Sequence, residues 1–468
     1  MISFSLPDIL ILILFFSALL LTGFYSGRKT TSEASNYLLS GRKVGLFLFV
    51  LTNVSTWYGG ILGVGEFTYR YGIVSWFTQG FPYYIFAFLF ALLFAKKIRE
   101  ASLFTIPDKL TEVYGKNVGL LSAVVVFVLV SPAPYILMSA GLLSLLFDLN
   151  IVLCLFISLI LSIAYLIKGG FRANVYADAM QFFVMFIGFI LIVIFSADKF
   201  GALEFISSSV PENHLELTGG MSPTFIIIWF LIALWTFADP GFHQRCYAAK
   251  SGNIAVKGII ISIFFWALFD FLTTTTGLFA YAVLPEIGNP VLAFPLFAEE
   301  VLPVGLKGIF YAALFATILS TLNSFLFLSG TTIGRDFVYR LNPTHNDGKL
   351  KHYTIIGLVI SGLIAILLAY IIPSVIEIWY TIGSLFIPAI ILPVVSAYYP
   401  KLRIDNRYIL VEMISAIAGS TIWYFIRSSF ESVPIVSEIE PMLVGIVLAL
   451  AIHFTISVTA KFNTTAAK

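Results

Sequence analysis

Thirteen apolar windows, each long enough to cross a lipid bilayer, constrain this chain more than any other feature of its sequence. A hydrocarbon core of about 30 Å needs roughly 20 apolar residues in a helix. Because lipid offers no partners to exposed backbone, we expect each window to be helical. The sequence therefore predicts an all-α polytopic membrane protein. The windows lie at 7–26, 44–69, 73–96, 117–147, 150–168, 174–197, 222–241, 255–284, 303–334, 353–372, 375–398, 408–426 and 439–460.

The composition agrees with a membrane protein. Hydrophobic residues make up 59% of the 468 residues and charged residues 11%, which is too apolar a composition for a soluble protein. The chain is also too long to be a single membrane anchor. Cys154 and Cys246 are far apart and predict neither a disulfide nor a metal site. The first window lacks a basic segment before it and a cleavage site after it, so we expect a transmembrane helix and not a signal peptide. A net charge of +2 gives no indication of nucleic-acid binding.

Lysine and arginine predict the orientation, because cytoplasmic loops are enriched in them. With thirteen spans, 23 of the 27 basic residues fall in the loops of one side. The pattern predicts a multi-pass protein of the plasma (inner) membrane with its N-terminus outside and its C-terminus in the cytoplasm. Acidic and proline-rich stretches at 198–221 and 285–302 are expected to form structured external caps. The four basic residues of the opposite side are Arg70, Lys199, Lys307 and Arg427.

The second window contains a run that should break its helix. The run contains four glycines, and each of them destabilises a helix interior by roughly 1 kcal/mol relative to alanine. Hydroxyl and amide side chains lie just before these glycines in the sequence. Irregular backbone at membrane depth survives where it is buried or lines a wet cavity, so this run indicates a binding site. The alternative is close helix packing. The residues are Thr52, Asn53, Ser55 and Thr56, followed by Gly59, Gly60, Gly63 and Gly65.

The ninth window has one oxygen-rich face. Thr317, Ser320, Thr321 and Ser324 recur at i, i+3, i+4 and i+7, with Asn323 beside them. Hydroxyl and carbonyl oxygens are hard ligands suited to Na⁺, so this face against a broken helix would form a nearly complete coordination shell. Hydrogen bonding between helices is the alternative interpretation.

Asp178 is expected about one turn into the sixth window, after a tight inner loop at Gly169 and Gly170. A carboxylate at that depth is costly unless it is paired, hydrated or bound to a cation, which favours a functional role. The alternative is an acid stabilised by the helix N-terminus.

The seventh window is also interrupted, because Pro240 removes a backbone donor and Gly241 loosens the chain. Asp239 is expected to cap the following helix or to pair with Arg245. His243 is expected at the interface. Two interruptions five spans apart, in opposite directions, predict an inverted repeat of spans 2–6 and 7–11. The first transmembrane helix and its inner loop would then occupy 1–43, the first repeat 44–200 and the second repeat 201–400. Two C-terminal helices and a short tail would occupy 401–468.

Three runs carry a resemblance to the sodium:solute symporter family: Gly169 to Gln181, Asp239 to Lys250, and ATILSTLNS at 316–324. The resemblance covers nearly the whole chain. It implies a leucine-transporter-like fold of about 13 helices with a 5+5 inverted repeat. It also implies a main Na⁺ site, formed by the carbonyls of Val54, Trp57 and Thr317 and the hydroxyls of Ser320 and Thr321.

Some members of the family bind a second Na⁺, and the resemblance carries that site to Asp178, Ser320, Asn323 and Ser324. Asn323 stands where a serine is common in this pattern. Several members also carry an aspartate in the second helix, where this chain has Ser55 and Thr56.

The run STWYGG followed by GEFTYRYG resembles the choline branch and related, monocarboxylate-type branches. The rings of Trp57, Tyr58 and Trp76 would be consistent with cation–π contacts to a quaternary ammonium. The sequence places no arginine in a central site that could bind a carboxylate. The substrate residues that the resemblance implies are Thr56, Tyr58, Gly59, Trp76, Gln79, Trp235, Thr236 and Tyr380.

Taken together, these features predict a secondary active transporter that couples inward Na⁺ movement to uptake of a small organic solute. Na⁺ is the expected coupling ion, with no organic cofactor, nucleic acid or obligatory protein partner. One alternative is proton coupling through Asp178, and another is a solute sensor that no longer transports. An enzyme is not expected, because no HExxH motif, His/Asp cluster or activated nucleophile occurs. A channel is not expected either, because it would need rings of charge or of backbone carbonyls in an open pore, and a site gated from two sides is a different design.

Overall fold

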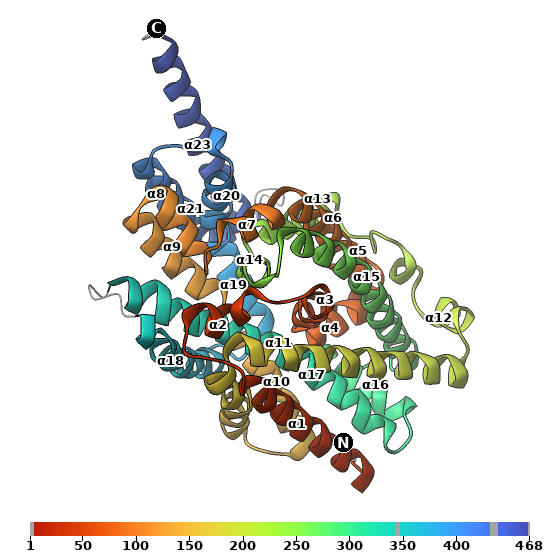
Figure 1. Cartoon of the computed structure of the whole chain (residues 1–468). Helices are drawn as coiled ribbons and strands as arrows, with labels where there is room; N and C mark the ends of the chain where they lie inside the picture. The colour runs from red at the N-terminus through yellow and green to blue at the C-terminus, as the bar shows by residue number, and fades with distance from the viewer. Residues whose placement is uncertain (1–3, 342–346, 431–438, 467–468) are drawn as a thin grey trace.

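The protein is a bundle of helices, seen in a computed structural model that describes residues 4–341, 347–430 and 439–466. No β-strand occurs in these ranges (Figure 1). The helices up to residue 200 are α1 (Leu6–Gly27), α2 (Ala34–Leu39), α3 (Leu46–Ser55), α4 (Ile61–Tyr71), α5 (Val74–Gln79), α6 (Phe81–Phe90), α7 (Lys96–Ala101), α8 (Ile106–Tyr114), α9 (Lys116–Leu129), α10 (Ala133–Phe147) and α11 (Ile151–Phe200). The later helices are α12 (Leu203–Ser209), α13 (Pro223–Ile232), α14 (Pro240–Ala248), α15 (Gly252–Val283), α16 (Ala293–Val301), α17 (Leu306–Thr331), α18 (Leu350–Ile371), α19 (Val375–Phe386), α20 (Pro388–Tyr398), α21 (Asn406–Ile426) and α23 (Pro441–Ala466).

The described residues contain 10 helices of membrane-crossing length and composition, or up to 12 if each of two bent pairs forms one span. The 50-residue α11 contains both expected windows 150–168 and 174–197. Its backbone leaves the helical region at Gly170, where φ is 55° and ψ is −148°. Gly170 lies against the backbone of Tyr37, so the left-handed φ and the close approach both require glycine. The total of thirteen membrane spans stays a prediction. It is reached when the two bent pairs are each counted as one span and α11 is counted as two spans.

The second span is broken, as the glycine-rich run predicts. α3 and α4 are separated by the short turn η2 (Thr56–Tyr58) and are bent by 57° relative to each other. The bend falls at Gly59 and Gly60, where two adjacent glycines leave the helix at its weakest. The prediction of a discontinuous second helix is therefore confirmed.

The seventh span is interrupted at the expected place. α13 continues into the tighter turns of η5 (Ala233–Ala238), and α14 begins at Pro240. Between them, Asp239 has extended backbone and its Oδ1 accepts a hydrogen bond of 3.0 Å from the Phe242 amide. Asp239 therefore caps α14, as expected, and Pro240 occupies a first-turn position where its missing N–H costs little.

The ninth span, α17, lies at the centre of the bundle. It packs most extensively against α11 and also contacts α1, α10 and α18. Almost every residue of α17 is buried, including Thr317, Ser320 and Thr321. Because the helix is surrounded by protein, its oxygen-rich face cannot point to lipid, and a polar stripe here must meet other polar groups.

The eleventh span has a bend that the sequence analysis did not predict. α19 and α20 are inclined by 52° around Ile387 and Pro388. Proline lacks a backbone N–H and its ring collides with the preceding turn, which accounts for the kink. α19 thereby faces the broken second span, and its Trp379 ring packs against Gly60.

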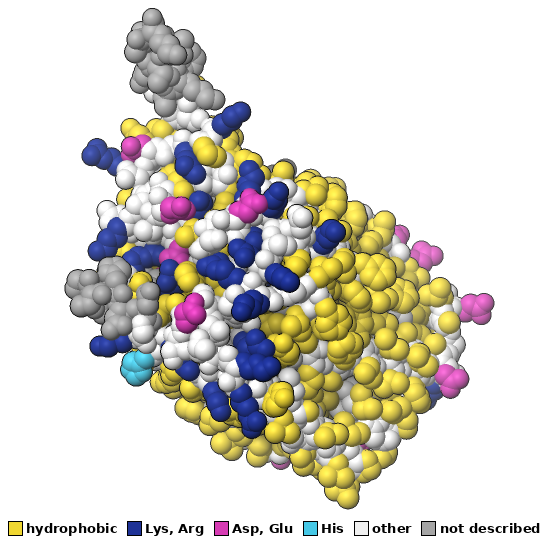
Figure 2. Space-filling view, in the orientation of Figure 1, with side chains coloured by type: hydrophobic (Ala, Val, Ile, Leu, Met, Phe, Trp, Pro, Cys, Tyr) yellow, Lys and Arg dark blue, Asp and Glu magenta, His cyan; other side chains and the backbone are white. Residues whose placement is uncertain are grey.

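Charged side chains divide between the two ends of the molecule. Figure 2 shows lysine and arginine gathered over the end that carries α2, α7 and α8, and acidic side chains at the opposite edge near α12. A broad hydrophobic surface covers the side facing the viewer between them. This arrangement fits a protein that spans a membrane with one basic end.

Candidate functional site

The oxygen-rich face of α17 meets the broken second span directly. Thr321 Oγ1 donates a hydrogen bond of 2.6 Å to the Thr56 carbonyl. Gly59 lies against the Thr321 side chain and leaves no room there for a Cβ. The glycine that breaks the helix therefore also permits the close approach of α17.

The five residues implied for the main Na⁺ site lie on the elements that meet at this junction, α3, η2 and α17. Val54, Thr317 and Ser320 are fully buried, Thr321 is nearly so, and Trp57 is half-buried. Thr317 Oγ1 donates to the Leu314 carbonyl at 2.7 Å, as hydroxyls in helices commonly do. The Ser320 hydroxyl is buried and has no hydrogen-bond partner. A buried polar atom left unpaired is costly, and an unpaired hydroxyl on this face fits the role of a cation ligand that the resemblance implies.

Asp178 on α11 lies in a dense polar cluster. Its Oδ2 accepts hydrogen bonds from Thr52 Oγ1 at 2.5 Å and from Asn174 Nδ2 at 3.2 Å. The carboxylate is fully buried, and its Oδ1 has no hydrogen-bond partner. Asp178 is therefore held inside the protein by groups from α3 and α11, and does not lie at a hydrated helix end.

Arg245 of α14 supplies the positive charge next to this carboxylate. Its Nη2 lies 3.6 Å from Asp178 Oδ2 and donates to Thr56 Oγ1 at 2.5 Å and to Thr52 Oγ1 at 3.1 Å. Arg245 is only 2% exposed. The expectation that no arginine reaches a central site is wrong, because the interruption at Asp239 turns α14 inward. Of the two roles considered for Asp239, the structure bears out the cap.

Of the remaining residues implied for a second Na⁺, Ser324 is already engaged by protein donors, whereas the side-chain oxygen of Asn323 is buried without a hydrogen-bond partner. Ser324 Oγ accepts from Asn174 Nδ2 at 2.7 Å and from Arg245 Nη2 at 3.1 Å. The Asn323 amide donates to the Tyr165 hydroxyl. Arg245 thus lies among the groups that a second ion would need.

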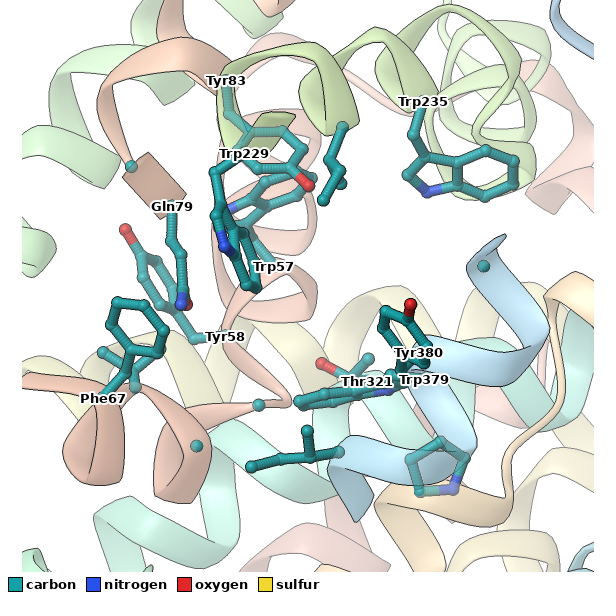
Figure 3. A pocket seen from close by; sticks show the side chains of 18 of the residues that line it. Trp57, Tyr58, Phe67, Gln79, Tyr83, Trp229, Trp235, Thr321, Trp379 and Tyr380 are labelled. Carbon is teal, nitrogen blue, oxygen red and sulfur yellow. The ribbon is translucent and has the colours of Figure 1, made fainter. Parts of the chain in front are cut away.

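A cavity of about 720 Å³ opens beside the junction. Figure 3 shows its aromatic lining: Trp57, Tyr83, Trp229 and Trp235 lie across from Trp379 and Tyr380, and Gln79 lies near Tyr58 and Phe67. The volume falls within the usual range of small-molecule sites, which are mostly apolar with a few polar groups.

Six of the eight residues implied for substrate binding line this cavity, and two do not. Gly59 packs against Thr321, and Thr236 is buried with its hydroxyl unpaired. The six that line the cavity are Thr56, Tyr58, Trp76, Gln79, Trp235 and Tyr380.

Sequence reasoning did not single out Asp270 on α15, which is an acidic residue of the cavity. It is 8% exposed and accepts a hydrogen bond from the Tyr84 hydroxyl. The available signal was the one used for Asp178, a lone carboxylate inside an apolar span. The polar character of the neighbouring threonine run, 273–276, made Asp270 less conspicuous.

The comparison with protein families settles the broad class. The sodium:solute symporter family matches residues 37–414. The chain belongs to this family. Its members and neighbours are transporters, which points away from an enzyme and favours Na⁺-coupled solute uptake over a proton-coupled carrier or a sensor.

Relatives of this symporter differ in the solutes they are named for. This chain is 26% identical to the osmoregulated proline transporter OpuE of Bacillus subtilis, over 98% of this chain and 96% of the relative. It is 24% identical to the high-affinity choline transporter 1 of Caenorhabditis elegans, over 81% and 72% of the two chains. The sodium/pantothenate symporter of Escherichia coli is 30% identical, but the match spans 46% of each chain.

Solved structures agree on the fold. A Na⁺-coupled sialic acid symporter, captured substrate-bound and outward-open, superimposes with a TM-score of 0.85 over 98% of both chains at 15% identity. A nucleobase-cation-symport-1 family transporter gives a TM-score of 0.52 over 92% of this chain and 96% of its own, also at 15% identity. The symporter described here therefore has the leucine-transporter-like fold, and the inverted repeat fits that fold. It is a multi-pass membrane protein.

Proposed function

We propose that this symporter couples the inward movement of Na⁺ to the uptake of a small organic solute by alternating access through the central cavity. The observation that carries the proposal is the junction of the broken second span with α17, where Thr321 bonds the Thr56 carbonyl. Thr56 and Thr321 also line the cavity. An ion bound at the junction would therefore change the shape of the solute site directly.

Na⁺ binds, in this proposal, between the carbonyls of Val54, Trp57 and Thr317 and the hydroxyls of Ser320 and Thr321. The unpaired, buried Ser320 hydroxyl supports this assignment. The ion would hold the broken helix against α17 and so favour the solute-binding form. Moving one charge inward is worth about 2.3 kcal/mol per 100 mV, enough to concentrate a solute many-fold.

A single Na⁺ is proposed for each transport cycle. The second set of residues, Asp178, Ser320, Asn323 and Ser324, contains two groups that Arg245 already contacts. A guanidinium 3.6 Å from the carboxylate supplies a fixed positive charge, and a second cation at the same place would be repelled.

The solute is proposed to contact the six cavity residues named above. We further propose that residues 44–200 and 201–400 form the two inverted repeats, flanked by 1–43 and 401–468. The basic end in Figure 2 supports a cytoplasmic C-terminus and an external N-terminus in the plasma (inner) membrane. The mechanism requires the bilayer, Na⁺ and the solute, and calls for no organic cofactor and no protein partner.

The test is a pair of double variants on α17. Ser320→Ala with Thr321→Ala removes two proposed ligands, and we expect the Na⁺ concentration for half-maximal uptake to rise at least ten-fold. Ser329→Ala with Thr331→Ala is the matched control, because these buried hydroxyls of the same helix also lack partners. Uptake into proteoliposomes with Na⁺ gradients of stated size gives the measurement. Equal Na⁺ dependence in both double variants would refute the site.

A further inference from the structure

The charged side chains that line the cavity differ in how their charges are matched. Glu66 pairs with Arg70 at 3.0 Å, and Glu440 pairs with Arg427 at 3.5 Å. Arg245 has Asp178, and Asp239 caps a helix. The six charged lining residues are Glu66, Arg70, Asp239, Arg245, Asp270 and Glu440.

Among the described residues, Asp239 and Asp270 are the two cavity acids without an ion pair, but Asp239 has a backbone amide of α14 as its donor, and no such helix cap involves Asp270. None of the ion pairs formed by the described residues includes it. Its carboxylate is engaged by the Tyr84 hydroxyl, whose oxygen in turn accepts from Trp76 Nε1 at 3.2 Å. The Tyr84 hydroxyl thus accepts from the indole and donates to Asp270, which is the acceptor at the end of this chain of hydrogen bonds.

The structure also makes room for this carboxylate at the cavity wall. A Cβ on Gly80 would lie 2.6 Å from Asp270 Oδ2, so the absence of a side chain there lets the carboxylate sit against α5 and α6. Trp76 and Gln79, on the turn just before Gly80, line the cavity with it. Asp270 therefore lies in the cavity wall, at the place where α15 meets α5 and α6.

A carboxylate at membrane depth, without a cation of its own, is stabilised when a cation binds beside it. The surrounding rings add to this preference, because tryptophan and tyrosine faces attract cations by about 0.5–2 kcal/mol each. Trp57, Trp76 and Tyr83 line the cavity together with Asp270. An anionic solute would meet an unfavourable charge at this wall.

We propose that Asp270 binds the positive charge of the transported solute, and that the solute is an organic ammonium ion. This inference rests on the proposed Na⁺-coupled uptake and adds the solute class to it. The relatives do not decide the question, since proline is a zwitterion, pantothenate an anion and choline a cation. Asp270 and its tyrosine donor are positioning and charge-matching groups for that ammonium.

The experiment measures ligand binding to the purified full-length protein in detergent, by thermal shift and titration, in NaCl and in KCl. The cationic probes are choline, tetramethylammonium and ethanolamine. The neutral control is 3,3-dimethylbutan-1-ol, which has the shape of choline without its charge, and proline and pantothenate represent the other charge classes. We expect at least one ammonium probe to bind in NaCl at least ten-fold more tightly than the neutral isostere.

Three variants connect the binding to Asp270. Asp270→Asn should weaken the bound ammonium at least ten-fold, and Asp270→Glu should restore part of that loss because it keeps the charge. Asp198→Asn removes an exposed acid at the end of α11 and should leave binding unchanged. The stabilisation of each variant by Na⁺ alone shows that it is folded and that its ion site is intact.

The outcomes separate this inference from the proposed function. Absence of binding by all three ammonium probes, binding of the neutral isostere as tightly as choline, or unchanged ammonium binding in Asp270→Asn would each overturn the assignment of Asp270. Na⁺-dependent binding of proline or pantothenate alone would overturn it while supporting Na⁺ coupling. Ammonium binding that depends on Asp270 but is equal in NaCl and KCl would support the assignment and count against the coupling.

Discussion

Asp178 and Asp270 are both buried in apolar spans of this symporter, and their surroundings differ. Asp178 has a guanidinium 3.6 Å away and donors from Thr52 and Asn174. Asp270 has a tyrosine hydroxyl and no cation of the described chain. Both carboxylates are costly to bury, so the difference indicates where the compensating charge comes from. For Asp178 the protein supplies it, and for Asp270 we infer that the solute does.

The positions of the two residues agree with this division. The Asp178–Arg245 pair connects α11 and α14 beside the junction of α3 with α17, and Arg245 is the member of the pair that lines the cavity. Asp270 lines the cavity itself. Asp178 is not among the residues that line the cavity, whereas Asp270 is, which agrees with a partner supplied by the protein for Asp178 and by the solute for Asp270.

The largest expected effect comes from removing the internal cation. Arg245→Gln leaves a buried carboxylate unpaired, which should destabilise the protein by about 3–5 kcal/mol and abolish uptake. The measurement is the apparent unfolding temperature in detergent, together with uptake into proteoliposomes. Lys96→Gln is the control, because the exposed Lys96–Glu100 pair should be worth about 0–1 kcal/mol. Equal losses in the two variants would show that Asp178 does not depend on its guanidinium.

An intermediate effect is expected when both charges of the internal pair are removed together. Adding Asp178→Asn to Arg245→Gln eliminates the unpaired carboxylate, so the double variant should be more stable than Arg245→Gln by about 1–3 kcal/mol. A double-mutant cycle on unfolding temperatures measures this coupling. The same cycle between Asp270→Asn and Arg245→Gln should give no coupling, which sharpens the contrast between the two aspartates.

The smallest effect is expected from the tyrosine that holds Asp270. Tyr84→Phe removes a hydrogen bond to a charged group, worth about 1.5 kcal/mol, and should weaken ammonium binding roughly ten-fold while Na⁺ stabilisation persists. Tyr114→Phe is the control, since its hydroxyl bonds to Ser396 away from the cavity. If Tyr114→Phe weakened the ammonium as much as Tyr84→Phe, the effect would be one of general packing.

Much of the fold could be predicted from local features of the chain. Gly59 and Gly60 weaken a helix wherever they occur, and Pro240 interrupts one for reasons confined to its own turn. The oxygen-rich face of α17 follows from helical periodicity. The bend at Pro388 also has a cause confined to its own turn, so the same reasoning could have predicted it. The helices that carry the main site residues meet, and the Na⁺ site itself stays a prediction.

The sequence by itself determined the membrane-spanning character, the two broken helices and the polar face, because each depends on neighbouring residues and on the period of one helix. Only the tertiary structure decided that Arg245 reaches Asp178 and that Tyr84, 186 positions from Asp270, is the group that contacts it. The physical reason is that periodicity specifies which face of a helix is polar, whereas packing decides which faces meet. Whether a buried charge has a partner in the protein is therefore a property of the fold.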